Sequence, residues 1–400
     1  MSASVSRPVP VSDVVIVGGG IMGTSCALFL RQRGLTVSLV ERGLVGQQAS
    51  GVNFGNVRRQ GRPMMQLPLA NRASALWRRM LELVGIDVEY LEVGHVRVCY
   101  RDRPELVEDL ESYAREARAH ELHLEILSGA AMRARFPYLG NEVLAASHAV
   151  HDGHANPRLV APAFARAAQR AGAQVFENTR IISVEKEGTD FRVTSDDGRI
   201  FRAPVLVVTA GAWANVLSAQ FGEPVDLVAR GPTMSVTEPV PYSIRPSTGV
   251  FTPVEQESVY FRQIARGNLI IGGSTRGPAY PDLCRAYVRP ENTLRQLKQI
   301  QRLAPALGRL NIIRTWSGIE GYTSDGLPVL GPSERVPGLY YAFGFSGSGF
   351  QIGPGVGETL AELIHTGTTS IPLEAYRMAR FSSAPVPPAG SAVGASQVEL

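Results

Sequence analysis

Residues 13–42, DVVIVGGGIMGTSCALFLRQRGLTVSLVER, carry the sequence pattern that decides the fold. A continuous apolar run predicts a buried strand at 14–17, and apolar residues at helical spacing predict a helix at 21–33. A second apolar run predicts a strand at 37–40. Strand, helix and strand in this order form a βαβ unit, which is the start of a parallel sheet.

The first turn of this unit contains Gly18-x-Gly20-x-x-Gly23, the spacing of a dinucleotide-binding fingerprint. The first glycine permits the tight turn, the second lets the backbone approach a pyrophosphate, and the third lets helix and strand pack closely. The phosphates would lie at the helix N-terminus, where free N–H groups favour negative charge. Glu41 ends the second strand, where its carboxylate can accept both ribose hydroxyls and would repel the 2′-phosphate of NADP. A chance glycine-rich turn is the alternative.

Length and composition restrict the class of protein. The 400 residues are 44% hydrophobic, enough for two domains or for one large domain with an inserted second one. The net charge of +4 is too small to indicate nucleic-acid binding and suits an anionic small molecule. Cys26, Cys99 and Cys284 are widely spaced, so neither a disulfide framework nor a zinc site is expected. We expect a cytoplasmic location without a transmembrane segment, and leave peripheral contact with the inner membrane open.

The pattern along the chain predicts an α/β protein with two interleaved domains. A Rossmann-like FAD-binding domain is expected at 12–90, 150–222 and 314–378, because parallel-sheet patterns return at 205–211 and 339–343. An α+β substrate domain built on an antiparallel sheet is expected at 91–149 and 223–313. Flexible tails are expected at 1–11 and 382–400. Such scattering of the sheet suits FAD better than NAD. The other predicted helices lie at 72–83, 104–121, 158–171, 291–303 and 355–365, and the other strands at 93–100 (exposed on one face), 175–177, 181–186, 191–195, 205–209, 233–237, 258–263 and 268–272.

Four further segments point to one family: the 49–51 loop, VLVVTAGAWAN at 205–215, YTSDGLPVLG at 322–331, and GLYYAFGFSGSGFQIGPGVGETLAELI at 338–364. With the βαβ unit, they make the chain resemble the D-amino-acid oxidase-like (DAO) family of FAD oxidoreductases over about residues 13–376. That family includes glycine and sarcosine oxidases, D-amino-acid dehydrogenases, and opine or hydroxyproline oxidase subunits. The motifs are specific for the family and not for the substrate.

The resemblance implies which residues hold FAD. In the family the glycine-rich loop at 344–351 would face the electron-rich edge of the flavin and stabilise its anionic reduced form. Relatives with covalently bound flavin use a Cys or a His at particular places. The flavin-linked Cys of monomeric sarcosine oxidases falls near 320–321, where this chain has no Cys, so noncovalent FAD is expected. The implied cofactor residues are Gly18, Gly20, Ile21, Met22, Gly23, Glu41, Arg42, Ser50, Gly51, Ala210, Gly211, Gly318, Gly344, Ser346, Gly347, Ser348, Gly349, Phe350 and Gln351.

The family chemistry removes a hydride equivalent from the carbon beside an amine. Arginine is suited to binding the substrate carboxylate, because its guanidinium group can donate two parallel hydrogen bonds to it. Arg58, Arg59 and Arg62 cluster in NVRRQGR, and Arg58 is our candidate, with a solvated basic loop or a phosphate contact as alternatives. Tyr260 and Arg262 alternate on a predicted strand and could face one cavity, unless this is an exposed strand face.

Two positions depart from the family pattern. Glu320 stands where glycine oxidase-like and D-amino-acid dehydrogenase-like relatives carry an Arg that grips the carboxylate. It could hold a cationic group of the substrate or neutralise an arginine. Gln351 replaces a Lys that sarcosine oxidases place beside the flavin for oxygen activation, which favours a dehydrogenase.

Other polar and aromatic clusters are interpreted as structural. His148, His151 and His154, with Asp152, occupy a segment that contains Gly and leads to Pro, so we expect cavity-lining or structural roles rather than a metal site. The three tryptophans, Trp77, Trp213 and Trp316, are expected to be core anchors.

The sequence therefore predicts a FAD-dependent oxidoreductase that oxidises the C–N bond of a small amino or imino acid to an imine. N-substituted or cyclic substrates are favoured over primary D-amino acids, and oxygen or a respiratory carrier would be the electron acceptor. The alternative is a flavoprotein subunit of a larger amine dehydrogenase or oxidase that needs its partner for activity.

Overall fold

The computed structural model describes residues 7–8 and 11–381. The βαβ unit forms as predicted: β2 (Val14–Val17) and β3 (Val37–Val40) pair in parallel with α1 (Ile21–Gln32) between them. Both strands are buried along their whole length, which explains their continuous apolar sequences.

A six-stranded sheet grows from this unit in the order β22-β23-β13-β2-β3-β9. The added strands are β9 (Gln174–Phe176), β13 (Val205–Val208), β22 (Val329–Pro332) and β23 (Leu339–Phe343). All neighbours are parallel except β22 and β23. The prediction that parallel strands return at 205–211 and 339–343 is therefore confirmed.

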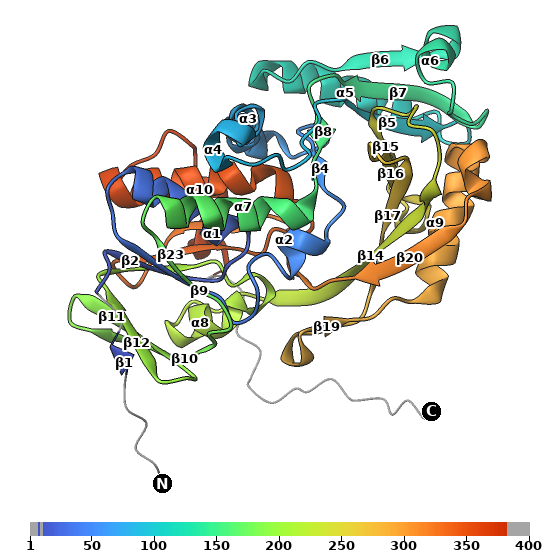
Figure 1. The fold of residues 1–400 in the computed structure, drawn as a ribbon. Coiled ribbons are helices and arrows are strands. Elements are labelled where there is room, and N and C mark those ends of the chain that lie inside the picture. The colour runs from blue at the N-terminus through green and yellow to red at the C-terminus, as the bar shows by residue number, and fades with distance from the viewer. Residues whose placement is uncertain (1–6, 9–10, 382–400) are drawn as a thin grey trace.

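Each face of this sheet carries its own layer. Figure 1 shows α1, α3 (Leu67–Arg78), α7 (Pro157–Arg170) and α10 (Gly349–Thr366) together on one face, over a core that includes Phe29, Trp77 and Phe164. A meander of β10 (Ile181–Glu187), β11 (Asp190–Ser195) and β12 (Arg199–Ala203) covers the other face, where Phe191 and Phe201 are buried. Burial on both faces is typical of a parallel sheet.

A nine-stranded sheet lies beside this assembly and is mainly antiparallel, with β15 and β5 as its parallel pair. The basic helix α9 (Pro290–Leu303) packs on its outer side, where Val259, Leu269 and Ile300 are buried together. The mixed α/β class and the antiparallel second sheet agree with the prediction. Its strands are β5 (His95–Tyr100), β6 (Glu125–Ser128), β7 (Val143–Ala149), β14 (Leu227–Pro239), β15 (Ser247–Val250), β16 (Val259–Gln263), β17 (Asn268–Gly277), β20 (Ile312–Ser317) and β21 (Glu320–Thr323).

The remaining elements are short or peripheral. The helices are α2 (Ala49–Val52), α4 (Met80–Val84), α5 (Leu106–Ala117), α6 (Gly129–Arg135) and α8 (Ala214–Gln220), and the strands are β1 (Arg7–Pro8), β4 (Asn56–Val57), β8 (Gly153–His154), β18 (Ala279–Tyr280) and β19 (Arg285–Ala286).

Several predicted elements need correction. The strand predicted at 93–100 was expected to expose one face, but β5 lies inside its sheet between β15 and β7, with apolar clusters on both faces. The helix predicted at 72–83 begins at Leu67 and is interrupted at Arg79. Within the predicted tail 1–11, β1 pairs in parallel with β12. The predicted tail 382–400 lies outside the described residues.

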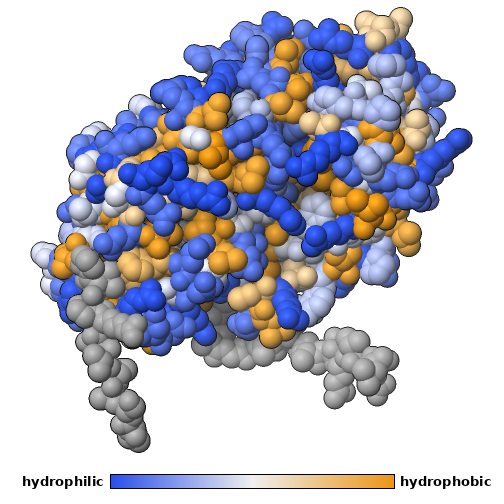
Figure 2. Space-filling view, in the orientation of Figure 1, coloured by the Kyte–Doolittle hydropathy of each residue, from blue (hydrophilic) through white to orange (hydrophobic). Residues whose placement is uncertain are grey.

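The surface is mixed in character. Figure 2 shows hydrophilic residues over most of the face seen there, with small hydrophobic groups between them. Single exposed apolar residues are ordinary on protein surfaces. Within residues 7–8 and 11–381, no helix combines the length and the apolar character that crossing a membrane requires.

Candidate active site

The glycine turn packs against the end of β13. Gly18 has a φ of +117°, and a Cβ there would lie 2.5 Å from the carbonyl oxygen of Thr209. A Cβ on Gly23 would overlap the Gly18 carbonyl oxygen and lie 2.6 Å from Thr209 Oγ1, which itself donates to that carbonyl at 2.8 Å. Side chains at these positions would push α1 away from the sheet, so both glycines are required by close packing.

Polar groups gather at the N-terminus of α1. Glu41 Oε2 accepts a hydrogen bond from the Gly19 N–H at 2.7 Å, and its Oε1 accepts from the Gly43 N–H at 2.9 Å. Ser50 Oγ accepts from the Ile21 N–H at 2.9 Å. A carboxylate thus lies beside a helix N-terminus, the arrangement that suits a ribose next to a pyrophosphate.

A cavity of about 870 Å³ begins at this turn and continues to the nine-stranded sheet. Of the predicted residues, Gly23, Gly51, Gly318 and Arg262 lie outside its wall. A Cβ on Gly51 would overlap the Gly46 carbonyl, and one on Gly318 would overlap Val52, so these two glycines allow close packing behind the wall. The predicted residues in the wall are Gly18, Gly20, Ile21, Met22, Glu41, Arg42, Ser50, Arg58, Ala210, Gly211, Tyr260, Glu320, Gly344, Ser346, Gly347, Ser348, Gly349, Phe350 and Gln351.

The tryptophans behave differently from one another. Trp77 is completely buried, as predicted for a core anchor, and Trp316 is partly buried and donates to the Val52 carbonyl at 2.8 Å. Trp213 instead lines the cavity, with the Arg42 guanidinium stacked 3.5 Å from the ring centroid. The expectation for Trp213 was therefore wrong. This tryptophan follows Ala210 and Gly211, just after β13, where the chain borders the cavity rather than the core.

The glycine-rich segment after β23 turns sharply before α10. Gly344, Ser346 and Gly347 have φ values of +71°, +49° and +79°, and Ser346 Oγ accepts from the Thr323 N–H at 3.2 Å. The helix begins at Gly349, six residues before the predicted start. The N-terminus of α10 therefore borders the cavity itself, where its N–H groups and dipole favour negative charge.

Gln351 is held by α3. Its Nε2 donates to the Ala70 carbonyl at 2.8 Å and to Ser74 Oγ at 3.2 Å, and the residue is buried. Trp77 Nε1 donates to the Gln351 carbonyl at 2.6 Å. Only part of the residue borders the cavity, and its amide ties α10 to α3.

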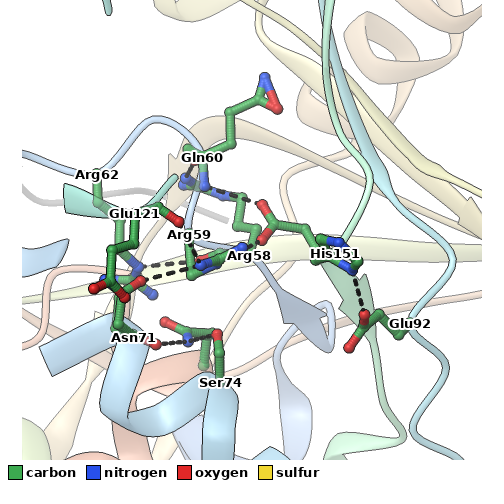
Figure 3. Close-up of polar contacts among 12 residues, drawn as sticks. Arg58, Arg59, Gln60, Arg62, Asn71, Ser74, Glu92, Glu121 and His151 are labelled. Carbon is green, nitrogen blue, oxygen red and sulfur yellow. Dashed lines mark hydrogen bonds and ion pairs between the residues drawn. The ribbon is translucent and has the colours of Figure 1, made fainter. Parts of the chain in front are cut away.

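The three clustered arginines have three different environments. Arg58 lines the cavity, and its Nη1 donates to the Gln60 carbonyl. Arg59 points away, toward Asn71 and Glu121, as Figure 3 shows, and pairs with Asp152 at 3.5 Å. Arg58 is therefore the one of these two that a cavity-bound carboxylate can reach.

Arg62 is in the cavity wall but uses its hydrogen bonds internally. Its guanidinium donates to the Arg58 carbonyl, to Gln66 Oε1 and to the Ser348 carbonyl at 3.1, 3.0 and 2.9 Å. Burial, and then the neighbouring Arg58, lower the pKa of Arg62 to about 9. Its role in the structure is to tie the arginine loop to the start of α10 while leaving a positive charge at the cavity.

Tyr260 and Arg262 point to the same side of β16 but reach different depths. Tyr260 lines the cavity and packs edge-on against Phe54, with 4.8 Å between ring centroids. Arg262 is buried behind Phe54, donating to its carbonyl at 2.7 Å and contacting His154 Nδ1 at 3.3 Å. Burial lowers the pKa of Arg262 to about 10. Its position in the structure is therefore a supporting one, behind the cavity wall.

Arg276 was not predicted from the sequence. It extends from β17 into the cavity wall, and its Nε donates to Tyr322 Oη at 2.7 Å. Tyr322 Oη donates in turn to Glu320 Oε2 at 2.7 Å. Burial, and then the Glu320 carboxylate, raise the pKa of Tyr322, which keeps its hydroxyl protonated. Glu320 is thus linked through one hydroxyl to Arg276, an arginine that the sequence analysis did not name.

The histidines lie in separate environments. His151 is exposed and contacts Glu92 at 2.7 Å (Figure 3), whereas His148 contacts Glu125 at 3.2 Å. Burial, and then the Arg262 charge, lower the pKa of His154 to about 3, so it is neutral. No group of three metal-binding side chains occurs among residues 7–8 and 11–381.

The residues present fit FAD. The cavity is lined both by the glycine turn and by residues of the nine-stranded sheet, and two glycines keep the turn clear of side chains. Arg42 Nη2 is buried without a hydrogen-bond partner within the described part of the chain, beside the cavity. A buried guanidinium N–H needs an acceptor, and the phosphates or adenine of a dinucleotide supply acceptors here.

Comparisons with known proteins agree with a FAD-binding fold. Residues 13–363 match the profile of the family described as FAD dependent oxidoreductase (DAO). The chain is 28% identical to glycine oxidase of Geobacillus kaustophilus over 377 residues (92% of this chain, 97% of that protein) and 29% identical to an opine oxidase subunit of Rhizobium meliloti over 337 residues (82% and 87%). The crystal structure of L-proline dehydrogenase from P. horikoshii superposes with a TM-score of 0.86 at 28% identity, covering 93% of this chain and 98% of that one.

Proposed function

The chain belongs to the DAO family of FAD-dependent oxidoreductases, and from that premise we propose that it oxidises the C–N bond of a small amino or imino acid. The observation that carries the proposal is the composition of one continuous cavity, with the glycine turn at one end and Arg58, Tyr260, Arg276 and Glu320 at the other. When bound, FAD supplies the acceptor for a hydride equivalent. Similarity to glycine oxidase, the opine oxidase subunit and L-proline dehydrogenase supports this substrate class.

The side chains at the end of the cavity next to the nine-stranded sheet have complementary roles in this proposal. Arg58 binds the substrate carboxylate, and Glu320 faces the amine. Tyr260 and Phe54 form an apolar wall that excludes water from the reacting carbon. The N-terminus of α10 faces the site where negative charge develops as the cofactor is reduced.

Atoms and electrons balance in this oxidation without any further reacting group from the protein. The substrate carbon loses a hydride equivalent, and its nitrogen loses a proton, which gives an imine. Water then adds to the imine and releases the amine and a carbonyl compound. The two electrons leave the protein to oxygen or to a respiratory carrier.

We infer noncovalent FAD. Cys26 and Cys99 are buried, and Cys284 lines the cavity close to Trp213, whose Nε1 donates to the Pro281 carbonyl at 3.0 Å. Trp213 stacks on Arg42 near the glycine turn, so this cysteine is expected at the adenosine end. Acid precipitation of the purified protein should release all of the yellow colour, and retained colour would indicate a covalent link.

A second candidate is a flavoprotein subunit that needs a partner, which similarity to the opine oxidase subunit favours. The β18–β19 hairpin borders the cavity and carries exposed Tyr280, Leu283 and Tyr287, a surface suited to a partner. A chain that binds FAD yet reduces it only after a second polypeptide is added would support this alternative.

The test is reduction of the flavin without oxygen. Purified protein is mixed anaerobically with glycine, sarcosine, L-proline, D-proline, iminodiacetate and an N-(1-carboxyethyl) amino acid, and bleaching of the flavin absorbance is followed. Rapid bleaching by at least one compound, and its loss in Arg58→Met with FAD still bound, is the expected result. If none of the compounds bleaches the flavin, alone or with a partner added, the proposed activity is wrong.

A further inference from the structure

A tyrosine hydroxyl separates an acid of the cavity wall from an arginine of the same wall. Tyr322 Oη donates to Glu320 Oε2 at 2.7 Å and accepts from Arg276 Nε at the same distance. Glu320 and Arg276 line the cavity, whereas Tyr322 lies outside its wall. No Lys, Arg or His nitrogen lies within 4.0 Å of the Glu320 carboxylate among residues 7–8 and 11–381. The acid and the arginine are therefore linked without forming a direct ion pair.

The three side chains converge on Gly347, in the glycine-rich segment before α10. A Cβ on this glycine would lie 3.3 Å from Tyr322 Oη, 3.4 Å from Glu320 Oε2 and 3.6 Å from Arg276 Nη2. The glycine thus leaves room for all three groups at one place in the wall. Because Arg276 Nη2 and the carboxylate both approach this point, rotation of either side chain would bring the two charges together if the hydroxyl were absent.

The tyrosine is held firmly enough to act as a spacer. Its ring centre lies 5.7 Å from the guanidinium carbon of Arg276 and 5.7 Å from that of Arg230, an exposed residue opposite Glu320 in the β14–β21 ladder. Arg276 Nη1 donates to the Gly273 carbonyl at 2.6 Å, which fixes the guanidinium. Burial, and then the Glu320 carboxylate, raise the pKa of Tyr322, so its hydroxyl stays protonated near neutral pH and can donate to the acid.

The hydroxyl occupies only one oxygen of the acid. Within the described part of the chain, Glu320 Oε1 has no hydrogen-bond partner, and the residue lines the cavity. A direct ion pair with Arg276 would engage the carboxylate and cancel much of its charge, because the Coulomb energy rises as two opposite charges approach. A neutral hydroxyl instead orients the carboxylate through one oxygen and leaves its negative charge for a cation in the cavity.

We propose that Tyr322 is a positioning residue that keeps Arg276 and Glu320 apart, so that Glu320 selects an amine at the substrate position. This rests on the proposed function, in which Glu320 faces the amine, and it assigns the roles of Tyr322 and Arg276, which that function leaves open. A ligand with an ammonium group gains a charge-assisted hydrogen bond to the free carboxylate, whereas a ligand with a hydroxyl group in the same place gains less. The three residues together thus select an amine over an alcohol of the same shape.

The test uses two inert ligands of nearly equal shape, 2-aminoisobutyrate and 2-hydroxyisobutyrate. Neither carries a hydrogen on the carbon beside the carboxylate, so neither can be oxidised there. Binding to the FAD-loaded protein is measured by perturbation of the flavin spectrum, and the ratio of the two Kd values is the amine preference. The variants are Tyr322→Phe, Glu320→Gln, and Tyr322→Phe combined with Glu320→Gln or with Arg276→Gln. Tyr242→Phe is the control, because Tyr242 is exposed and lies outside the cavity wall. FAD content and thermal unfolding are recorded for every variant.

The wild type should prefer the amine about 10-fold or more, as expected for one hydrogen bond to a charged group. Tyr322→Phe should reduce this preference about 5-fold, because Arg276 then pairs with the acid, and Tyr242→Phe should leave it unchanged. Glu320→Gln should abolish the preference, and adding Tyr322→Phe to it should change the Kd ratio by less than about 2-fold, since Tyr322 acts through Glu320. Adding Arg276→Gln to Tyr322→Phe should restore the preference about 3-fold, because no arginine remains to pair with the acid.

Four results would overturn the inference. They are no amine preference in the wild type, an unchanged preference in Tyr322→Phe, equal weakening of both ligands in that variant, and no recovery when Arg276→Gln is added. The proposed function is tested separately, by anaerobic bleaching of the flavin with glycine and L-proline. Bleaching without a Tyr322-dependent preference would contradict this inference alone. A Tyr322-dependent preference without bleaching by any amine, with or without a partner, would contradict the proposed function alone.

Discussion

Replacing Gly23 by alanine tests the central packing contact of the cofactor site. A Cβ there would overlap the Gly18 carbonyl oxygen and lie 2.6 Å from Thr209 Oγ1, whereas ordinary van der Waals contact begins at 3.4 Å, so α1 must retreat by more than about 0.8 Å. Alanine favours a helix by about 1 kcal/mol over glycine, and overpacking costs about 1–3 kcal/mol. Stability should therefore change little, whereas the helix N-terminus leaves its place at the cavity. Losing one charge-assisted hydrogen bond there costs about 1.5–3 kcal/mol.

This predicts FAD binding weakened about 10- to 100-fold in Gly23→Ala, measured by titrating the deflavinated protein with FAD and following flavin fluorescence. Thermal unfolding of the FAD-free protein supplies the stability comparison. Gly34→Ala is the control, because Gly34 has a φ of +85° with no atom within 4 Å of a Cβ, so it should cost about 1–2 kcal/mol of stability and no FAD affinity. Wild-type FAD affinity in Gly23→Ala would refute the packing argument.

Three further outcomes follow from the site. Glu320→Gln should lower kcat/KM for the amine substrate about 10-fold or more while FAD content and the contact with Arg276 persist, because only the negative charge is lost; unchanged kcat/KM would remove Glu320 from the proposed amine site. Trp213→Ala should weaken FAD binding about 5-fold by releasing Arg42, as measured by the same fluorescence titration. The pKa of His154 is 6.5 in the unfolded chain and about 3 in the folded protein. The contribution of neutral His154 to the free energy of unfolding should therefore be fully present above pH 6.5 and be lost as the pH falls toward 3, by about 1.4 kcal/mol per pH unit. The free energy of unfolding in urea should depend less steeply on pH in His154→Gln.

The parts of the fold with strict local patterns were predictable. The strands β2 and β3 were placed correctly because burial on both faces demands continuous apolar residues, and the turn between β2 and α1 demands glycine. The return of the sheet at β13 and β23 followed from the same pattern. These features depend on a few neighbouring residues and so can be predicted locally.

The start of α10 was not predictable because tertiary packing overrides helix propensity there. Its first turns contain glycines and a proline, which disfavour a helix. A Cβ on Gly353 would lie 2.8 Å from Ile21 atoms, and one on Gly355 would lie 3.0 Å from Ala73 Cβ. The small residues therefore let α10 lie against α1 and α3, and the propensity cost is offset by contacts made with distant parts of the chain.

Arg276 explains what the acid at position 320 does. The predicted strand ended at Gly272, but β17 continues to Gly277. Gly272 serves another purpose, because a Cβ there would lie 2.9 Å from Tyr260 Cζ. The strand thus passes under the tyrosine ring and delivers an arginine to Glu320 through one hydroxyl. The family resemblance predicts an arginine at position 320, where this chain has Glu320, and Arg276 reaches that glutamate from β17 through Tyr322. Substrate recognition must therefore be worked out from the three-dimensional charge arrangement rather than from position 320 alone.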